Sequence, residues 1–243
     1  MNVFKLFCFP YAGGASTVFK EWRKYLDPRI ELVPVEIAGR GQRIHESLYK
    51  DMAGAVEDLF LIIRNNIGNS PYALFGHSMG GKICYNLAQK ISAAESMPLP
   101  QHIFFSGCGA PHIDRKDKKK FHQMNDADFI REVLSLGGTP PEFFEHPELL
   151  DLFLPVLRSD FRMIETLVVN PRVSPLNTDI SVLFGREEDL TTEQKAEWKL
   201  HTLKTCREYF FDGGHFFIHQ ETAAIVSIIN TTLAKNFTAV YHS

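Results

Sequence analysis

The chain lacks a strong excess of charge of either sign. Its 243 residues include 26 Lys and Arg against 29 Asp and Glu, which gives a formal net charge of −3. A protein whose main partner is nucleic acid needs a basic surface to neutralise the phosphates. We therefore expect no nucleic-acid partner.

Long apolar runs and cysteine pairs are missing as well. No run reaches the roughly 18 apolar residues of a membrane span, and the apolar run Val3–Phe9 is short and interrupted by Lys5. The 4 cysteines form no Cys-x-x-Cys pair, and no cluster of His, Cys and Asp suggests a metal. Free thiols in apolar surroundings are typical of a reducing compartment. The expected protein is cytoplasmic, with no membrane association.

What is present is an alternation of short apolar runs with stretches of helical periodicity. This alternation predicts a parallel sheet covered by helices on both faces, an α/β fold. The expected strands are Phe4–Phe9, Ile30–Val35, Ala73–Phe75, Ile103–Ser106, Ile180–Phe184 and Glu208–Phe211. The expected helices between and after them are Phe19–Leu26, Ala53–Ile67, Met79–Ala94, Glu193–Leu203 and Thr222–Leu233.

One segment interrupts the alternation. From about residue 112 to 173 only helical patterns occur, near Asp126–Leu136 and Pro147–Val168. Such a length exceeds what a crossover between two strands needs. We expect a single domain over residues 1–243 with a helical lid inserted at about 112–173. A helical subdomain without a gating role is the alternative.

The strongest motif surrounds Ser78. The apolar run Tyr72–Phe75 leads into Gly76-His77-Ser78-Met79-Gly80, and a helical pattern follows. A nucleophile elbow has this order, with the serine on a tight turn at the start of a helix. Ser78 is the predicted nucleophile.

A second motif overlaps the first. Gly76, Gly81 and Lys82 match the beginning of a phosphate-binding loop, but the next residue is Ile83 rather than Ser or Thr. The hydroxyl that would bind magnesium is missing, so we reject a mononucleotide site.

A serine nucleophile needs a base and an acid that orients it, and in this fold they follow in the order Ser, Asp or Glu, His. His215 follows the last expected strand in a Gly-Gly-His turn and is the predicted base. The turn after Phe184 supplies three consecutive carboxylates. We expect Asp189 to be the acid, with Glu188 as the main alternative and Asp160, in the expected lid, as a more distant one.

The oxyanion needs two backbone donors. The N–H of Met79, the residue after the nucleophile, is the first by the geometry of the elbow. The second is expected from the loop Pro10–Ser16. We assign it to Ala12, with Tyr11 and Gly13 as alternatives.

Several motifs together resemble the type II, external thioesterases of nonribosomal peptide and polyketide synthesis. They span nearly the whole chain: Phe9-Pro10-Tyr11-Ala12-Gly13-Gly14, Gly39-Arg40-Gly41-x-Arg43, Phe75-Gly76-His77-Ser78-Met79-Gly80-Gly81, Ser106-Gly107-x-x-Ala110-Pro111, Leu136-Gly137-Gly138-x-Pro140, Arg158-Ser159-Asp160-Phe161-Arg162 and Gly213-Gly214-His215-Phe216. The chain departs from the family at Ala38, where proline is usual, and in the acidic turn, where a single aspartate is usual.

The resemblance implies an α/β-hydrolase fold with a helical lid. It also implies hydrolysis of acyl or aminoacyl groups from the phosphopantetheine thiol of acyl or peptidyl carrier proteins, without metal or diffusible cofactor. The triad and oxyanion roles fall on Ser78, His215, Met79 and Ala12. A hydrolase of free esters or amides, and a binding protein on a hydrolase scaffold, are the alternatives. Nothing in the sequence requires more than a monomer.

Two features of the insertion bear on partners. The basic run 115–120 follows the fourth expected strand and can attract an acidic carrier protein, although we favour a solvated loop as its explanation. The insertion is also rich in phenylalanine. These rings can line an acyl channel or form the core of the lid itself.

Overall fold

The computed structural model describes residues 3–94, 96–113, 119–138 and 146–237. Its centre is a six-stranded parallel sheet in the order β2-β1-β3-β4-β5-β6. The strands are β1 (Phe4–Phe9), β2 (Ile30–Pro34), β3 (Tyr72–His77), β4 (His102–Ser106), β5 (Asp179–Gly185) and β6 (Cys206–Phe211). All six predicted strands are confirmed, with ends that differ by at most two residues.

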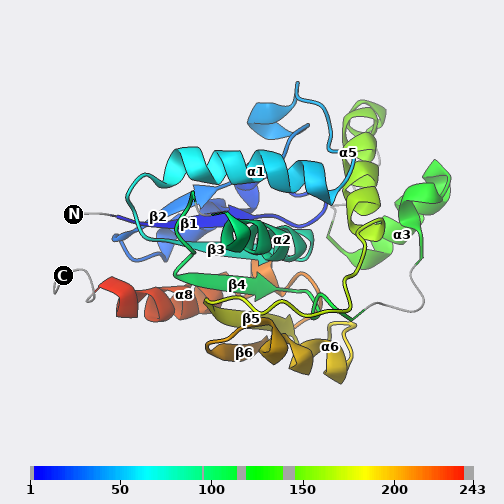
Figure 1. Ribbon diagram of the computed structural model, residues 1–243. Coiled ribbons are helices and arrows are strands. Elements are labelled where there is room, and N and C mark those ends of the chain that lie inside the picture. The colour runs from blue at the N-terminus through cyan, green and yellow to red at the C-terminus, as the bar shows by residue number, and fades with distance from the viewer. Residues whose placement is uncertain (1–2, 95, 114–118, 139–145, 238–243) are drawn as a thin grey trace.

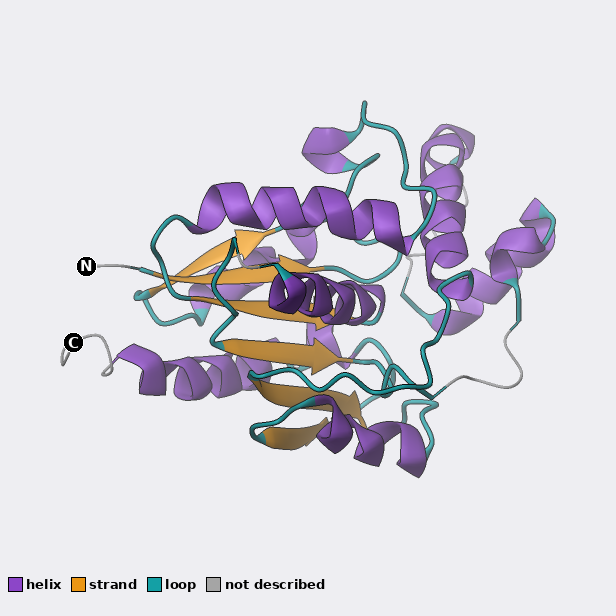
Figure 2. Ribbon diagram, in the orientation of Figure 1, coloured by secondary structure: helices purple, strands orange, loops and turns teal. Residues whose placement is uncertain are grey.

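Helices cover both faces of the sheet (Figures 1 and 2). They are η1 (Ser16–Lys24), η2 (Gly41–Arg43), α1 (Met52–Ile67), α2 (Met79–Ala93), η3 (Phe121–Gln123), α3 (Asp126–Leu136), α5 (Pro147–Glu165), α6 (Thr192–Ala196), η4 (Glu197–His201), α7 (Phe217–Gln220) and α8 (Thr222–Phe237). The helix predicted over Phe19–Leu26 is a 3₁₀ helix that begins earlier, and the one over Glu193–Leu203 is split into α6 and η4. No helix in the described part of the chain is long and apolar enough to cross a membrane.

Two apolar clusters form the core because alternate strand residues point to opposite faces. Phe7 and Leu74 belong to the cluster under α1 and α2. Leu6 and Phe75, their neighbours in the chain, belong to the cluster under η1 and α8. A sheet covered in this way on both faces explains why its inner strands are almost continuously apolar.

The segment between β4 and β5 carries α3 and α5, which stand at the carboxyl ends of the strands (Figure 1). These two helices have a small core of their own around Phe129, Val133 and Leu157. Phe161 stacks on Phe121 at 5.0 Å, and its ring meets that of Phe129 edge-on. Phe143 and Phe144 lie outside the described residues, as do 115–118 of the basic run.

Candidate active site

The candidate site is built around Ser78, at the turn between β3 and α2. Ser78 has φ 56° and ψ −111°, and it is the one residue other than glycine with positive φ in the described part of the chain. This strained conformation holds the side chain at the start of α2, a position typical of a nucleophile. The Ser78 N–H donates to the carbonyl oxygen of Ser106 over 2.7 Å, so the last residue of β4 helps to hold the turn.

Close backbone approaches make the turn possible. A Cβ added to Gly76 would lie 2.1 Å from the Gly80 carbonyl oxygen, and one added to Gly80 would lie 2.1 Å from that of Phe9. Because backbone atoms cannot yield as a flexible side chain does, both positions require glycine. The motif Gly-x-Ser-x-Gly thus follows from how tightly β1, β3 and α2 meet.

His215 lies beside Ser78, as the motif order predicts. Its Nε2 is 2.8 Å from the Ser78 Oγ, and its Nδ1 is 2.5 Å from the Oε1 of Glu188. Since the carboxylate only accepts, Nδ1 carries the proton and Nε2 accepts from the Ser78 hydroxyl. This is the arrangement in which imidazole can remove the serine proton.

The carboxylate at His215 is Glu188, not the expected Asp189. The Glu188 N–H donates to the Gly185 carbonyl over 3.2 Å, which closes a turn, and the Gly185 N–H donates back to the Glu188 Oε2 over 3.3 Å. This turn directs Glu188 inward, where its side chain is 3% exposed, whereas Asp189 is exposed. The expectation for the acid is corrected accordingly. Asp160, the third candidate, lies in another ion pair.

His77 holds the backbone of His215 in place. It is fully buried, and burial together with the neighbouring His215 keeps its pKa well below 6.5, so the ring is neutral. The carbonyl of His215 accepts from the His77 Nε2–H over 2.9 Å, and the His77 Nδ1 accepts from the Ser106 hydroxyl over 2.8 Å. Both ring nitrogens of His77 are therefore used to hold the loop that carries His215.

The loop after β1 shows which N–H groups are occupied. The Gly13 N–H donates to the Asp160 Oδ2 over 2.8 Å, and the Gly14 N–H donates to the Tyr11 carbonyl over 2.9 Å. Gly13 is thereby removed as a candidate oxyanion donor. Within residues 3–94 and the other described ranges, no hydrogen bond engages the N–H of Ala12 or Met79.

The backbone N–H of Tyr11 is the remaining alternative to that of Ala12 as an oxyanion donor. The Tyr11 side chain makes a separate contact that joins two segments of the site. Its hydroxyl is 2.9 Å from the Nε2 of His219. Burial lowers the pKa of His219 and raises that of Tyr11, so neutral imidazole accepts from the phenol. The loop after β1 and helix α7, which follows His215, are joined by this bond.

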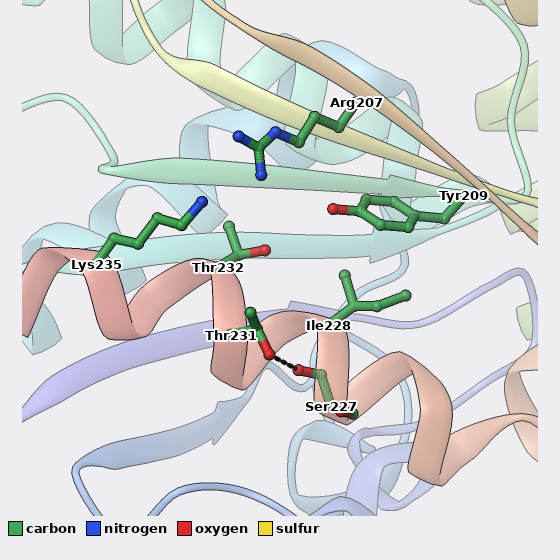
Figure 3. Close-up of a pocket in the computed structure, with 7 residues that line it drawn as sticks. All are labelled: Arg207, Tyr209, Ser227, Ile228, Thr231, Thr232 and Lys235. Carbon is green, nitrogen blue, oxygen red and sulfur yellow. Dashed lines mark hydrogen bonds between the residues drawn. The ribbon is translucent and has the colours of Figure 1, made fainter.

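The site does not overlap with a pocket on the surface beside β6. That pocket lies between β6 and α8 and is lined by Arg207, Tyr209, Ser227, Ile228, Thr231, Thr232 and Lys235 (Figure 3). Arg207 is at the start of β6, whereas Glu188 and His215 follow strand ends. The described ranges contain no group of three or more His, Cys, Asp or Glu placed to hold a metal ion.

Comparison with known proteins decides the family. The thioesterase domain family matches residues 4–233. The chain belongs to the thioesterase domain family. It is a hydrolase of thioesters, and its sheet and helices are those of the α/β-hydrolase fold.

A curated relative is similar to this chain over most of its length. It is "Linear gramicidin dehydrogenase LgrE" of Brevibacillus parabrevis, 34% identical over 94% of this chain and 87% of the relative. Although this relative is named a dehydrogenase, the loop Pro10–Ser16 in this thioesterase lacks the Gly-x-Gly-x-x-Gly of dinucleotide sites.

Two solved structures are also similar. ClbQ from the colibactin NRPS/PKS pathway has a TM-score of 0.89 and 31% identity, covering 96% of this chain and 98% of its own. The type II thioesterase BorB from the borrelidin biosynthetic cluster has a TM-score of 0.84 and 31% identity, covering 95% of this chain and 93% of its own. The predicted resemblance to type II thioesterases is confirmed.

Proposed function

We propose that this thioesterase releases acyl or aminoacyl groups from the phosphopantetheine arm of acyl or peptidyl carrier proteins, with Ser78, His215 and Glu188 as its triad. The observation that carries the proposal is the hydrogen-bonded chain from the Ser78 Oγ through the His215 ring to Glu188. The similarity to ClbQ and BorB supports the carrier-bound substrate and a role in editing or release.

In the first half-reaction the Ser78 Oγ attacks the thioester carbonyl carbon while the His215 Nε2 takes the hydroxyl proton. Glu188 accepts from the Nδ1–H and stabilises the imidazolium that forms. The N–H groups of Met79 and Ala12 donate to the oxyanion. The C–S bond then breaks, and the pantetheine sulfur leaves as the thiol after receiving the proton from His215.

In the second half-reaction water attacks the acyl-serine. His215 takes a proton from the water and returns it to the Ser78 oxygen as the C–O bond breaks, which releases the carboxylic acid. The sequence of steps uses no metal and no diffusible cofactor. A thiolate is a better leaving group than an alkoxide, so leaving-group protonation matters less for a thioester than for an ester.

We further assign the chain to one α/β domain, residues 1–243, with 112–173 as its lid. The enzyme acts as a monomer in the cytoplasm, where the four free cysteines fit a reducing compartment. No nucleic acid and no membrane takes part in the reaction.

The test compares one acyl group in two forms. A phosphopantetheinylated carrier protein is loaded with the acyl group, and a free ester of the same acid serves as the alternative substrate. We expect a higher kcat/KM for the carrier-bound thioester. A strong preference for the free ester would overturn the carrier-protein assignment and favour a small-molecule esterase.

A further inference from the structure

Two motifs in the sequence have no part in the proposed triad: Gly39-Arg40-Gly41 and Arg158–Arg162. They meet in the structure at a buried ion pair. Arg40, 7% exposed, binds Asp160, 3% exposed, through two hydrogen bonds of 2.7 Å each. Asp160 lies in the lid helix α5, so the pair joins the lid to the loop after β2.

The same pair also binds two backbone groups of the loop after β1. The Asp160 Oδ2 accepts from the Gly13 N–H over 2.8 Å, and the Gly14 carbonyl accepts from the Arg40 Nη1 over 3.1 Å. Gly13 also packs closely against α5. A Cβ on Gly13 would lie 2.8 Å from Leu157 and 2.9 Å from Phe153, both on that helix. Three segments distant in the chain are thus fixed at the residue next to Ala12.

Stability alone explains this pair poorly. Two charges removed from water lose their hydration, and well-packed apolar residues of similar volume often do as well or better in a buried position. The Arg40 Nε is also buried without a hydrogen-bond partner, which leaves part of the guanidinium unsatisfied. What the pair supplies that apolar side chains cannot is a directed acceptor for one particular backbone N–H.

We propose that Asp160 and Arg40 are positioning residues for the oxyanion hole. The Gly13 N–H that Asp160 holds belongs to the peptide plane that follows Ala12, and the Gly14 carbonyl that Arg40 holds lies two residues after Ala12. Together these two contacts fix the backbone of the loop and aim the Ala12 N–H at the oxyanion. The lid helix therefore takes part in forming the oxyanion hole as well as covering the site. This inference rests on the proposed triad mechanism.

The decisive variant is the double substitution Arg40→Met with Asp160→Leu. It replaces the charged pair by apolar groups and leaves no buried charge unpaired, so we expect the variant to fold and to lose less stability than one that leaves Arg40 unpaired. Loss of one oxyanion donor costs about 10²–10³ in kcat, and a misdirected donor costs less, so we expect kcat to fall about 10- to 100-fold with KM nearly unchanged. Affinity for an alkyl boronic acid, which forms a tetrahedral adduct with the serine, should fall by a similar factor.

The single variant Asp160→Asn should be more active but less stable than the double variant. Its side-chain carbonyl still accepts from Gly13, so kcat should be higher than in the double variant, but Arg40 is left as a buried unpaired charge and stability should be lower. Asp126→Asn is the matched control, since Asp126 pairs with Arg158 of α5 over 2.6 Å and Asp126 is exposed. We expect it to change kcat less than about twofold.

The proposal is overturned if the double variant keeps wild-type kcat and boronate affinity, or if kcat in the two variants follows stability. Should the double variant not fold, Asp160→Ala is compared with Asp160→Asn, because both leave Arg40 unpaired but only asparagine retains an acceptor for the Gly13 N–H. Equal kcat and boronate affinity in these two variants overturn the proposal, and a greater loss of both in Asp160→Ala at unchanged KM supports it. Ser78→Ala is measured alongside. Wild-type activity in Ser78→Ala would refute the triad itself, whereas an inactive Ser78→Ala beside a fully active double variant would refute only the positioning role.

Discussion

Glu188 and Asp189 are adjacent carboxylates that the backbone directs to different surroundings. Glu188 closes a turn with Gly185 and reaches the Nδ1 of His215, while Asp189 is exposed. An acid in this position keeps the imidazole in the tautomer that accepts from the serine and stabilises its protonated form. The two residues therefore offer a matched pair for mutation.

Glu188→Gln should lower kcat by about 10³- to 10⁴-fold, because an amide can present its N–H₂ to the Nδ1 and favour the wrong tautomer. Asp189→Asn should change kcat less than about threefold. The measurement is kcat for thioester hydrolysis by each variant, with circular dichroism as a control for folding. A larger loss in Asp189→Asn than in Glu188→Gln would show that the acid is Asp189 after all.

The identity of the acid could not be predicted from the sequence, whereas the serine and the histidine could. Ser78 and His215 each sit in a motif with glycines at fixed spacing, and the structure brings them within 2.8 Å. The run Glu187-Glu188-Asp189 contains three chemically equivalent candidates, and only the direction of the turn separates them. The link from Arg40 to Asp160 spans 120 positions in the chain, and no local pattern indicates such a contact.

At the scale of elements, the helices and strands follow closely from local patterns. A short apolar run predicts β1 at Phe4–Phe9 and helical spacing predicts α3 at Asp126–Leu136, both as found. The type and bounds of the helix Ser16–Lys24 do not follow from the pattern, because apolar residues three positions apart fit a 3₁₀ helix as well as an α helix. The direct packing of α2 on β1 could not be predicted from the sequence either, since it depends on a close approach of two backbones rather than on side chains.

That packing predicts opposite effects for two glycines that both lie in helices. Gly80→Ala should destabilise the protein by about 3 kcal/mol or more, because the new Cβ meets the carbonyl of Phe9, which cannot move freely. Gly54→Ala in α1 should stabilise by about 0.5–1 kcal/mol, since its Cβ meets only Asp51 at 3.5 Å. Urea unfolding of both variants measures the difference. Similar stability in the two would contradict the tight contact between α2 and β1.

For the whole molecule, the core holds histidines in the neutral form. Burial is the main cause in each case: it lowers the pKa of His77 well below 6.5 and that of His102 and His201 to about 4. His77 holds the loop of His215, and His102 bonds to the hydroxyl of Ser181 in the neighbouring strand. None of these rings can take up a proton in the fold as readily as in the unfolded chain.

Stability should therefore fall as the solution is acidified. Above pH 6.5 both states hold these rings neutral; below it the unfolded chain binds protons that the folded one does not. Each such histidine then lowers the free energy of unfolding by at most about 1.4 kcal/mol per pH unit. Urea unfolding at pH 7.5, 6 and 5 tests this, and His102→Gln should show a shallower decline. A free energy of unfolding that is constant across this range would contradict the expectation.

The most direct measurement of the proposed mechanism is the rate at which Ser78→Ala releases an acyl group from a loaded carrier protein, compared with the wild type. Removing the nucleophile should lower kcat by about 10³-fold or more, with folding unchanged. Release by Ser78→Ala at the wild-type rate would contradict the assignment of Ser78, His215 and Glu188 as the catalytic triad.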